Sequence, residues 1–411
     1  MLRKTQLLFV VLVVLALSSG ILPAAAQDDV TLRYFTFSAA PDFLDELDII
    51  IAAFEETNPG IAVEVTTAPF ADYFTLLQAD IVSGDAPDVF ELNYENFVTY
   101  AANDTLLDLS EYVSEDAPYY PRALEAFQYE GQQLALPETF STVLLFYNAD
   151  LFDQAGLDYP TADWTWEDAT ATAESISALG DDVWGLYSPV QFWEFYKKAA
   201  QNGECSFFNE DMTESTINSP ACVETLSMMV DFIDSGLMPS AEQLSGVSDS
   251  ELFLSGNLGM LVTGIWMFGA FEDASFTWDV QVEPMINQQA HHFFANGVAV
   301  SATTEQAEAA AKWAEFLTAS ETAATVRVDS GWELSALDQP EYFEAYLEQS
   351  PPENRTAVFQ ALESPVTPPV IERQNEMQDA VNALLTRVVD GELTPQEALD
   401  EAKTELDALI Q

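Results

Sequence analysis

The residues that most often carry catalysis are scarce in this chain and fall in no pattern that a known chemistry uses. The 411 residues include 2 histidines, the adjacent His291 and His292. Neighbouring residues of a strand face opposite sides, so the two rings make a poor chelate, and we expect one packed and one exposed ring. The sequence contains no HExxH, CxxC or GxSxG motif and no phosphate-binding glycine loop. It therefore predicts no catalytic residue, no metal site and no bound cofactor.

Carboxylates are the remaining candidates for acid–base chemistry, but they are too abundant to point to one place. The chain has 69 Asp+Glu against 12 Lys+Arg, which gives a formal net charge of -57. A glycoside hydrolase needs two carboxyl groups at a set separation, which a sequence does not supply, so a secreted glycoside hydrolase stays open as an alternative. Phosphate backbones repel so acidic a chain, which excludes nucleic acid as a partner.

Aromatic residues beside polar ones favour the binding of a small molecule. Phe192, Trp193, Phe195 and Tyr196 fall in one short segment, and Trp266 ends the run Thr-Gly-Ile-Trp. A sugar ring offers a C–H face to an aromatic side chain and hydroxyl groups to amides and carboxylates around it. Carboxylates with aromatics would equally suit a cationic amine. Each aromatic could also be a core residue, because large aromatic side chains dominate protein cores.

The first residues have the three parts of a secretory signal peptide. Arg3 and Lys4 precede an apolar run over 7–17, and Ala24-Ala25-Ala26 supplies an A-x-A cleavage site. The apolar run is shorter than the about 20 residues that span a bilayer. We expect residues 1–26 to be removed and the chain to be exported, periplasmic or extracellular. No cysteine stands at the cleavage site, so a lipoprotein anchor is not indicated.

The two cysteines of the chain, Cys205 and Cys222, are candidates for a disulfide. Disulfides persist in exported proteins, so we expect the two to pair, with two buried free thiols as the alternative. Closing the loop between them would stabilise the fold by about 3 kcal/mol in the chain-entropy account.

Short β-rich runs alternate with helical stretches along the chain, which is the α/β pattern. In the first third, strand and helix alternate from one strand to the next, which implies right-handed crossovers and a parallel sheet. The last part of the chain turns nearly all helical. We expect strands at 31–37, 61–65, 88–90, 143–147, 183–187 and 259–262, and helices at 43–58, 73–82, 166–179, 220–235, 249–254, 304–318, 373–389 and 394–409.

Several segments, taken in order, resemble the extracellular solute-binding proteins of ABC transporters, the carbohydrate-binding family that includes maltose-binding protein. One segment, from Phe253 to Trp266, is similar to the family's F-x-x-G-x-x-x-M-x-x-x-G-x-W pattern. Together the matching segments cover most of the chain after residue 26. The others lie at 54–65, 84–89, 106–109, 136–137, 145–157, 164–167 and 391–399.

This resemblance implies an α/β fold of two discontinuous lobes joined by hinge strands, with a ligand cleft between them, the type II periplasmic binding protein fold. The N-terminal lobe is expected at 27–138 and 296–343, and the C-terminal lobe at 139–295 and 344–411. The resemblance implies a monomer, not an enzyme, that captures a sugar or oligosaccharide by hinge closure and delivers it to the transmembrane subunits of an ABC permease. A polyamine, a peptide or another solute is the alternative ligand.

Three tryptophans are candidate ligand platforms by the same resemblance. Trp266 matches the Gly-x-Trp aromatic that stacks on a sugar ring in the family. Trp193 is placed by the match of its loop. Trp332 stands where family members often have a proline, and it is either a packing residue or a ligand platform.

Polar and aromatic residues at strand ends complete the expected site. The loop from Glu91 to Glu95 falls where the family places cleft-lining side chains, and a second stretch lies at the hinge crossing after Leu136-Pro137. The carboxyl end of the first strand should also open on the cleft, by the crevice rule for α/β sheets. The candidates are Asn93, Tyr94, Glu95, Glu138, Ser141, Phe37 and Ser38.

Overall fold

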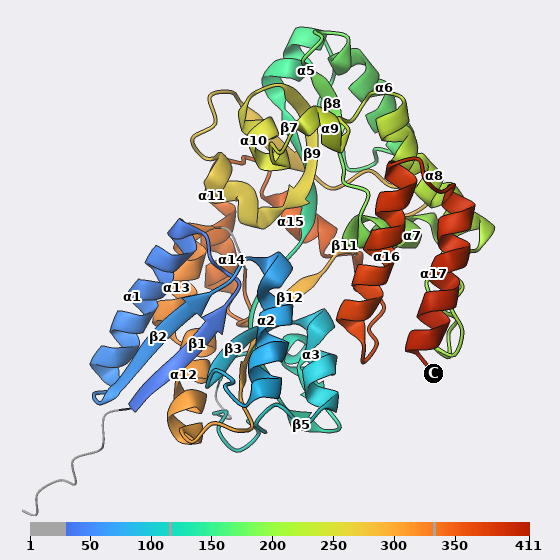
Figure 1. Cartoon of the computed structure of the whole chain (residues 1–411). Helices are drawn as coiled ribbons and strands as arrows, with labels where there is room; N and C mark the ends of the chain where they lie inside the picture. Colours follow the sequence, from blue (N-terminus) through green and yellow to red (C-terminus); the bar gives the residue numbers. More distant parts are fainter. Residues whose placement is uncertain (1–29, 115–116, 332–333) are drawn as a thin grey trace, which may run out of the picture.

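The computed structural model describes residues 30–114, 117–331 and 334–411. The expected signal peptide, residues 1–26, and Trp332 lie outside these residues. Two β-sheets, each with helices packed against it, form the lower and upper parts of the molecule in Figure 1. All the strands and helices predicted from the sequence are present, and their ends differ from the predictions by no more than three residues.

The first sheet has six strands in the order β13-β6-β12-β3-β1-β2. Strand β1 is parallel to β2 and to β3, which confirms the parallel arrangement predicted for the first third of the chain. Strand β12 is antiparallel to both β3 and β6 and so brings a distant segment into the middle of this sheet. The strands are β1 Val30–Thr36, β2 Ile61–Thr67, β3 Val89–Asn93, β6 Ala135–Ser141, β12 Phe294–Val300 and β13 Leu334–Ser335.

Helix α1 Pro41–Thr57 covers this sheet because its apolar residues repeat at helical spacing. Leu47, Ile50 and Phe54 are buried in the first core. Trp313 of α12 packs between the helix and the sheet, with its ring 5.1 Å from that of Phe54 and 5.9 Å from that of Tyr34. The core beside the first sheet therefore joins residues that lie far apart in the chain. Around it lie α2 Phe70–Ser83, α3 Tyr94–Ala102, α4 Pro121–Ala126, α12 Ala307–Ala319, α13 Glu321–Ser330 and the small hairpin β4 Gln128–Tyr129 and β5 Gln132–Gln133.

The second sheet has four strands in the order β10-β7-β9-β8. Strand β7 is antiparallel to β9 and β10, and β8 is parallel to β9. A Cβ on Gly185 of β8 would stand 2.2 Å from the backbone oxygen of Ala173, so only glycine lets α6 approach this strand. The elements are β7 Val143–Asn148, β8 Trp184–Tyr187, β9 Leu258–Gly264, β10 Trp278–Gln281, α5 Ala149–Ala155, α6 Trp166–Ser177, α8 Pro220–Asp234, α9 Ala241–Leu244, α10 Asp249–Leu254, the 3-10 turn η1 Ile265–Met267 and α11 Phe268–Phe271.

Two segments that join the sheets run beside each other. The chain passes from β6 to β7 through Thr142, and it returns through β11 His291–His292 into β12. The Thr142 hydroxyl donates to the backbone oxygen of His292 over 2.6 Å. Both histidines are buried, so the expectation of one exposed ring is wrong. The reason is that the returning segment is enclosed on both sides, because β11 also pairs with β14 Pro365–Val366.

The C-terminal helices pack against helices of the second half. Helix α16 lies against α7, α8, α17 and also α3 of the first half, as Figure 1 shows for the red and teal helices. A disulfide between Cys205 and Cys222 ties the segment after α7 to the first turn of α8, with a Cα–Cα distance of 4.7 Å. These elements are α7 Phe192–Asn202, α14 Pro340–Leu347, α15 Thr356–Ala361, α16 Gln374–Val389 and α17 Pro395–Leu409. Among the described residues, no helix is both long and apolar enough to cross a bilayer.

Two segments expected as loops are regular structure. Strand β3 continues to Asn93, and α3 begins at Tyr94, so the loop expected from Glu91 to Glu95 is wrong. The Asn93 side chain accepts a hydrogen bond from the Asn96 backbone N–H and so caps the helix. Trp193 was expected in a loop, but it lies in the first turn of α7.

Candidate functional site

Three aromatic side chains meet where the returning segment enters the first sheet. Phe294, the first residue of β12, has its ring 5.3 Å from that of Trp193 and 5.8 Å from that of Trp266. All three side chains are partly exposed. The structure thus brings two of the sequence-predicted tryptophans to one place, although they lie far apart in the chain. We call Trp193, Trp266 and Phe294 the aromatic platform.

Local structure holds the two tryptophans. Trp266 lies in η1, directly after β9, and its ring folds back over Gly264. A Cβ on Gly264 would stand 2.1 Å from that ring, so a larger residue there would displace it. At the start of α7, the Phe192 backbone N–H donates to the side-chain oxygen of Asn382 on α16 over 2.8 Å, which anchors the turn that carries Trp193.

His292 lies behind the platform. Its ring stacks on Phe294, with centroids 4.6 Å apart and an angle of 20° between the planes. The Tyr196 hydroxyl and His292 Nδ1 share a hydrogen bond of 2.6 Å. Burial, with a smaller contribution from the nearby Lys197, lowers the pKa of His292 to about 3. The imidazole is therefore neutral at physiological pH and offers Phe294 an uncharged stacking surface.

A buried ionic cluster, most of which lies on α7, is next to His292. Lys197 and Lys198 both pair with Glu194 and Glu283, and all four side chains are at most 5% exposed. Burial opposes the charge of Glu194, but the two lysines outweigh it and hold the pKa of this carboxyl well below its usual range. Burial also opposes the charge of Lys198, yet the two carboxylates raise its pKa. The cluster fixes α7, which carries Trp193.

Several predicted polar residues lie beside β12. Asn93 is paired in register with Asn296, and Ser141 is paired with Phe294. Both Asn93 and Ser141 are buried. Tyr94 follows at the start of α3 and is half-buried, and its pKa is raised by burial and then by Glu95.

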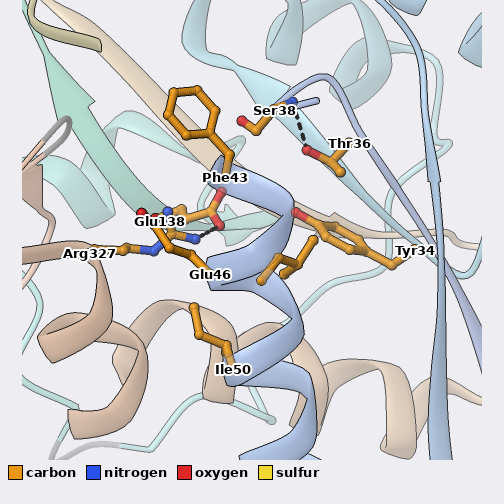
Figure 2. Close-up of a pocket in the computed structure, with 9 residues that line it drawn as sticks. Tyr34, Thr36, Ser38, Phe43, Glu46, Ile50, Glu138 and Arg327 are labelled. Atoms are coloured by element: carbon orange, nitrogen blue, oxygen red, sulfur yellow. Dashed lines mark hydrogen bonds and ion pairs between the residues drawn. The ribbon is translucent and has the colours of Figure 1, made fainter. Parts of the chain in front are cut away.

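Of the remaining predicted residues, Glu138 and Ser38 line a separate small pocket on the first lobe, shown in Figure 2. Its cavity of about 20 Å³ admits a single water molecule and no sugar ring. Glu138 forms an ion pair there with Arg327 of α13. Burial raises the pKa of Glu138, and Arg327 opposes this shift. The pocket is lined by Tyr34, Thr36, Ser38, Phe43, Glu46, Leu47, Ile50, Glu138 and Arg327.

Phe37 and Ser38 follow β1, but neither belongs to the aromatic platform. The Phe37 ring packs edge-on against Phe70 and Tyr73, at centroid distances of 5.2 and 5.1 Å. The Ser38 hydroxyl donates to the Glu91 carboxylate over 3.3 Å. These residues therefore support the end of β1 next to the small pocket.

Sequence reasoning missed Phe294, Tyr196 as a partner of His292, and Arg327. Phe294 directly precedes the Ala-Asn-Gly of the returning strand, a position that the strand pattern could have marked. No local signal marks Arg327, because its partner Glu138 is remote in the sequence. Among the residues that the structure describes, no group of three or more His, Cys, Asp or Glu side chains could hold a metal ion.

Comparisons with known proteins agree with this geometry. Residues 40–324 match the family described as bacterial extracellular solute-binding protein. An ABC substrate-binding protein of Listeria monocytogenes, solved in complex with cycloalternan, is 46% identical, covers 93% of this chain and 99% of that chain, and superposes with a TM-score of 0.89. The GacH receptor of Streptomyces glaucescens, at 19% identity and a TM-score of 0.82, covers 93% of this chain and 99% of its own, and shares the fold.

Curated relatives are more distant. The galactooligosaccharide-binding protein of Bacillus subtilis is 25% identical over 361 residues, which are 86% of this chain and 83% of that protein. A binding protein of Brucella abortus is 26% identical over 258 residues, so the match spans 61% of this chain and 60% of that relative's length. With two sheets joined by crossing strands, the chain has the α/β two-lobed fold of the type II periplasmic binding proteins, and it belongs to the family of bacterial extracellular solute-binding proteins.

Proposed function

We propose that the protein is the extracytoplasmic solute-binding component of an ABC importer, and that it captures an oligosaccharide between its lobes and delivers it unaltered to the permease. The observation that carries the proposal is the similarity, at 46% identity over nearly all of both chains, to a protein solved in complex with cycloalternan. The aromatic platform supports it, because Trp193 and Trp266 are partly exposed and lie against Phe294 of β12, the strand that pairs with Asn93 and Ser141.

The mechanism needs no bond chemistry. A ligand that touches both lobes makes all its contacts only in the closed form, so it shifts the open–closed equilibrium by its differential affinity for that form. Periplasmic binding proteins are a standard example of such hinge closure. The permease would recognise the closed shape, and ATP hydrolysis belongs to that partner.

The proposal includes the lobe division at 27–138 with 296–343 and 139–295 with 344–411. The four strands of the second sheet all lie between residues 143 and 281, which supports this division. Strands β6 and β12 each run a few residues past a proposed boundary toward the other lobe, as hinge strands would. The protein would act as a monomer outside the cytoplasm after removal of residues 1–26.

A ligand screen by thermal unfolding tests this function. We expect cycloalternan, maltotriose or a galactooligosaccharide to raise the unfolding midpoint, because a ligand at 100 times its Kd stabilises the native state by about 2.7 kcal/mol. Spermidine and a tripeptide serve as the competing classes. Stabilisation by one of these alone, or a saccharide whose mass changes during incubation with the protein, would contradict the proposal.

A further inference from the structure

The Glu95 carboxyl is buried without a compensating partner. The residue lies in the first turn of α3 and is 0% exposed. No other residue that the structure describes donates a hydrogen bond to either carboxylate oxygen. Only the backbone N–H of Glu95 itself opposes the effect of burial on the pKa of this carboxyl. An isolated carboxylate is so costly to remove from water that a buried one takes up a proton instead. Glu95 is therefore a neutral acid in this conformation.

Elements of both lobes surround this carboxyl. Glu95 and Thr99 lie one helical turn apart on the same face of α3. The Thr99 hydroxyl donates over 2.8 Å to the backbone oxygen of Glu372, just before α16. Helix α16 packs against α3, as Figure 1 shows. On α7, burial is the main cause that raises the pKa of Tyr196 well above its usual value. The carboxyl of Glu95 is the next cause, which places it near Tyr196. The face of α3 that carries Glu95 is thus covered by the second lobe.

The groups around Glu95 supply no counter-charge. On α7, Tyr196 shares its hydroxyl with His292, and both lysines are paired with Glu194 and Glu283. Strand β12 has no titratable residue, and β4 contributes only Tyr129. Strand β3 contributes Glu91, whose carboxylate accepts hydrogen bonds from the hydroxyls of Thr36 and Ser38. The charged residues of α16 have partners of their own or face solvent. Glu376, in the first turn, pairs with Arg373, and both side chains are about half exposed. Asp379 is exposed, and Arg387 pairs with Glu392 and Glu401.

We infer that closure of the lobes encloses Glu95, so that ligand capture is coupled to the uptake of one proton at this carboxyl. The inference rests on the proposed function, because it takes the closed form to be the ligand-bound one. When α7 and α16 move away from α3, the carboxyl meets water as an anion in the first turn of a helix, where the macrodipole favours negative charge. On closing, the carboxylate takes a proton from solvent and becomes a carboxylic acid.

The direction of the pH dependence follows from burial. Desolvation raises the pKa of Glu95 to about 8 in the closed form, from an ordinary 4.5. A group with the higher pKa in the closed form favours closure when protonated. The contribution of Glu95 to the free energy of closure is complete below the open-form pKa, and it is lost as pH rises through the closed-form pKa. Between these limits the apparent Kd should rise by up to about tenfold per pH unit.

Calorimetric titration with cycloalternan tests the coupling. At pH 6.5, titrations in phosphate and in Tris, which differ in ionisation enthalpy, should report the uptake of close to one proton per ligand bound. Between pH 5.5 and 7.5 the Kd should rise by at least tenfold. The Glu95→Gln variant should bind at pH 7.5 at least as tightly as the wild type at pH 5.5, with no slope. Glu64→Gln, an exposed carboxyl on β2, should keep the wild-type slope.

The outcomes separate the inference from the proposed function. If cycloalternan binds with the same enthalpy in both buffers, no proton is taken up, and the inference is overturned while the function stands. This comparison uses the wild type and does not depend on any variant folding. Loss of binding by Glu95→Gln at every pH, with an unchanged circular dichroism spectrum, would show that Glu95 contacts the ligand and would also overturn the inference. If no saccharide of the screen binds, the proposed function fails, and the inference fails with it.

Discussion

Replacing Trp266 with alanine is expected to weaken oligosaccharide binding by about 30-fold, which corresponds to ~2 kcal/mol, the loss typical of a central aromatic contact. Trp266 is partly exposed and lies beside Phe294, so the truncation removes stacking surface. The same change removes little from the core, and the unfolding midpoint without ligand should fall by only a few degrees. Calorimetric titration of both proteins with the same saccharide measures the difference.

Trp164→Ala is the matched control for this prediction. Its ring is also partly exposed and lies on the second lobe, stacked on Phe152 with centroids 6.4 Å apart. We expect this variant to lose a similar amount of packing and to bind the saccharide as the wild type does. An equal loss of affinity in the two variants would mean that the platform makes no specific contact with the ligand.

The largest expected effect on stability is that of Lys198→Met. Lys198 donates to Glu194 over 2.6 Å and lies 3.3 Å from a Glu283 oxygen, in a cluster closed to solvent. Removing one cation leaves two buried carboxylates facing Lys197 alone, and an uncompensated buried charge costs about 3–5 kcal/mol. Urea unfolding followed by tryptophan fluorescence should show this loss in the free energy of unfolding.

A second substitution distinguishes charge imbalance from lost packing. Glu283→Gln added to Lys198→Met removes the excess negative charge, so the double variant should recover part of the lost stability. The exposed pair of Lys312 and Glu308 gives the surface reference, and Lys312→Met should cost under about 1 kcal/mol. If the losses of Lys198→Met and Glu283→Gln simply add, the electrostatic account of the cluster is wrong.

Most regular elements could be predicted because their patterns are local. Helix α1 has apolar residues on one stripe, and β1, β2 and β3 alternate with helices. Helix α7 has apolar residues at helical spacing, among them Phe192, Phe195 and Ala199, but its aromatic residues were interpreted as candidates for binding a small molecule. The burial of Lys197 and Lys198 could not be predicted, because it depends on ion pairs with Glu283, which lies far along the chain. The burial of both histidines likewise depends on distant segments.

The candidate site could be predicted only in part. Trp266 was placed by a sequence pattern, whereas its neighbour Phe294 reaches it through a strand that returns from the second lobe. Glu138 was expected at the hinge crossing, yet its ion pair with Arg327 is visible only when α13 is folded against β6. The isolation of Glu95 is equally invisible in the sequence, because the elements that cover it come from α7 and α16.

Closure of the two lobes around a saccharide would make the molecule more compact. Small-angle X-ray scattering with and without saturating cycloalternan measures this change. We expect a smaller radius of gyration with the ligand bound. Calorimetric binding of the saccharide with no change in that radius would mean that the lobes do not close around it.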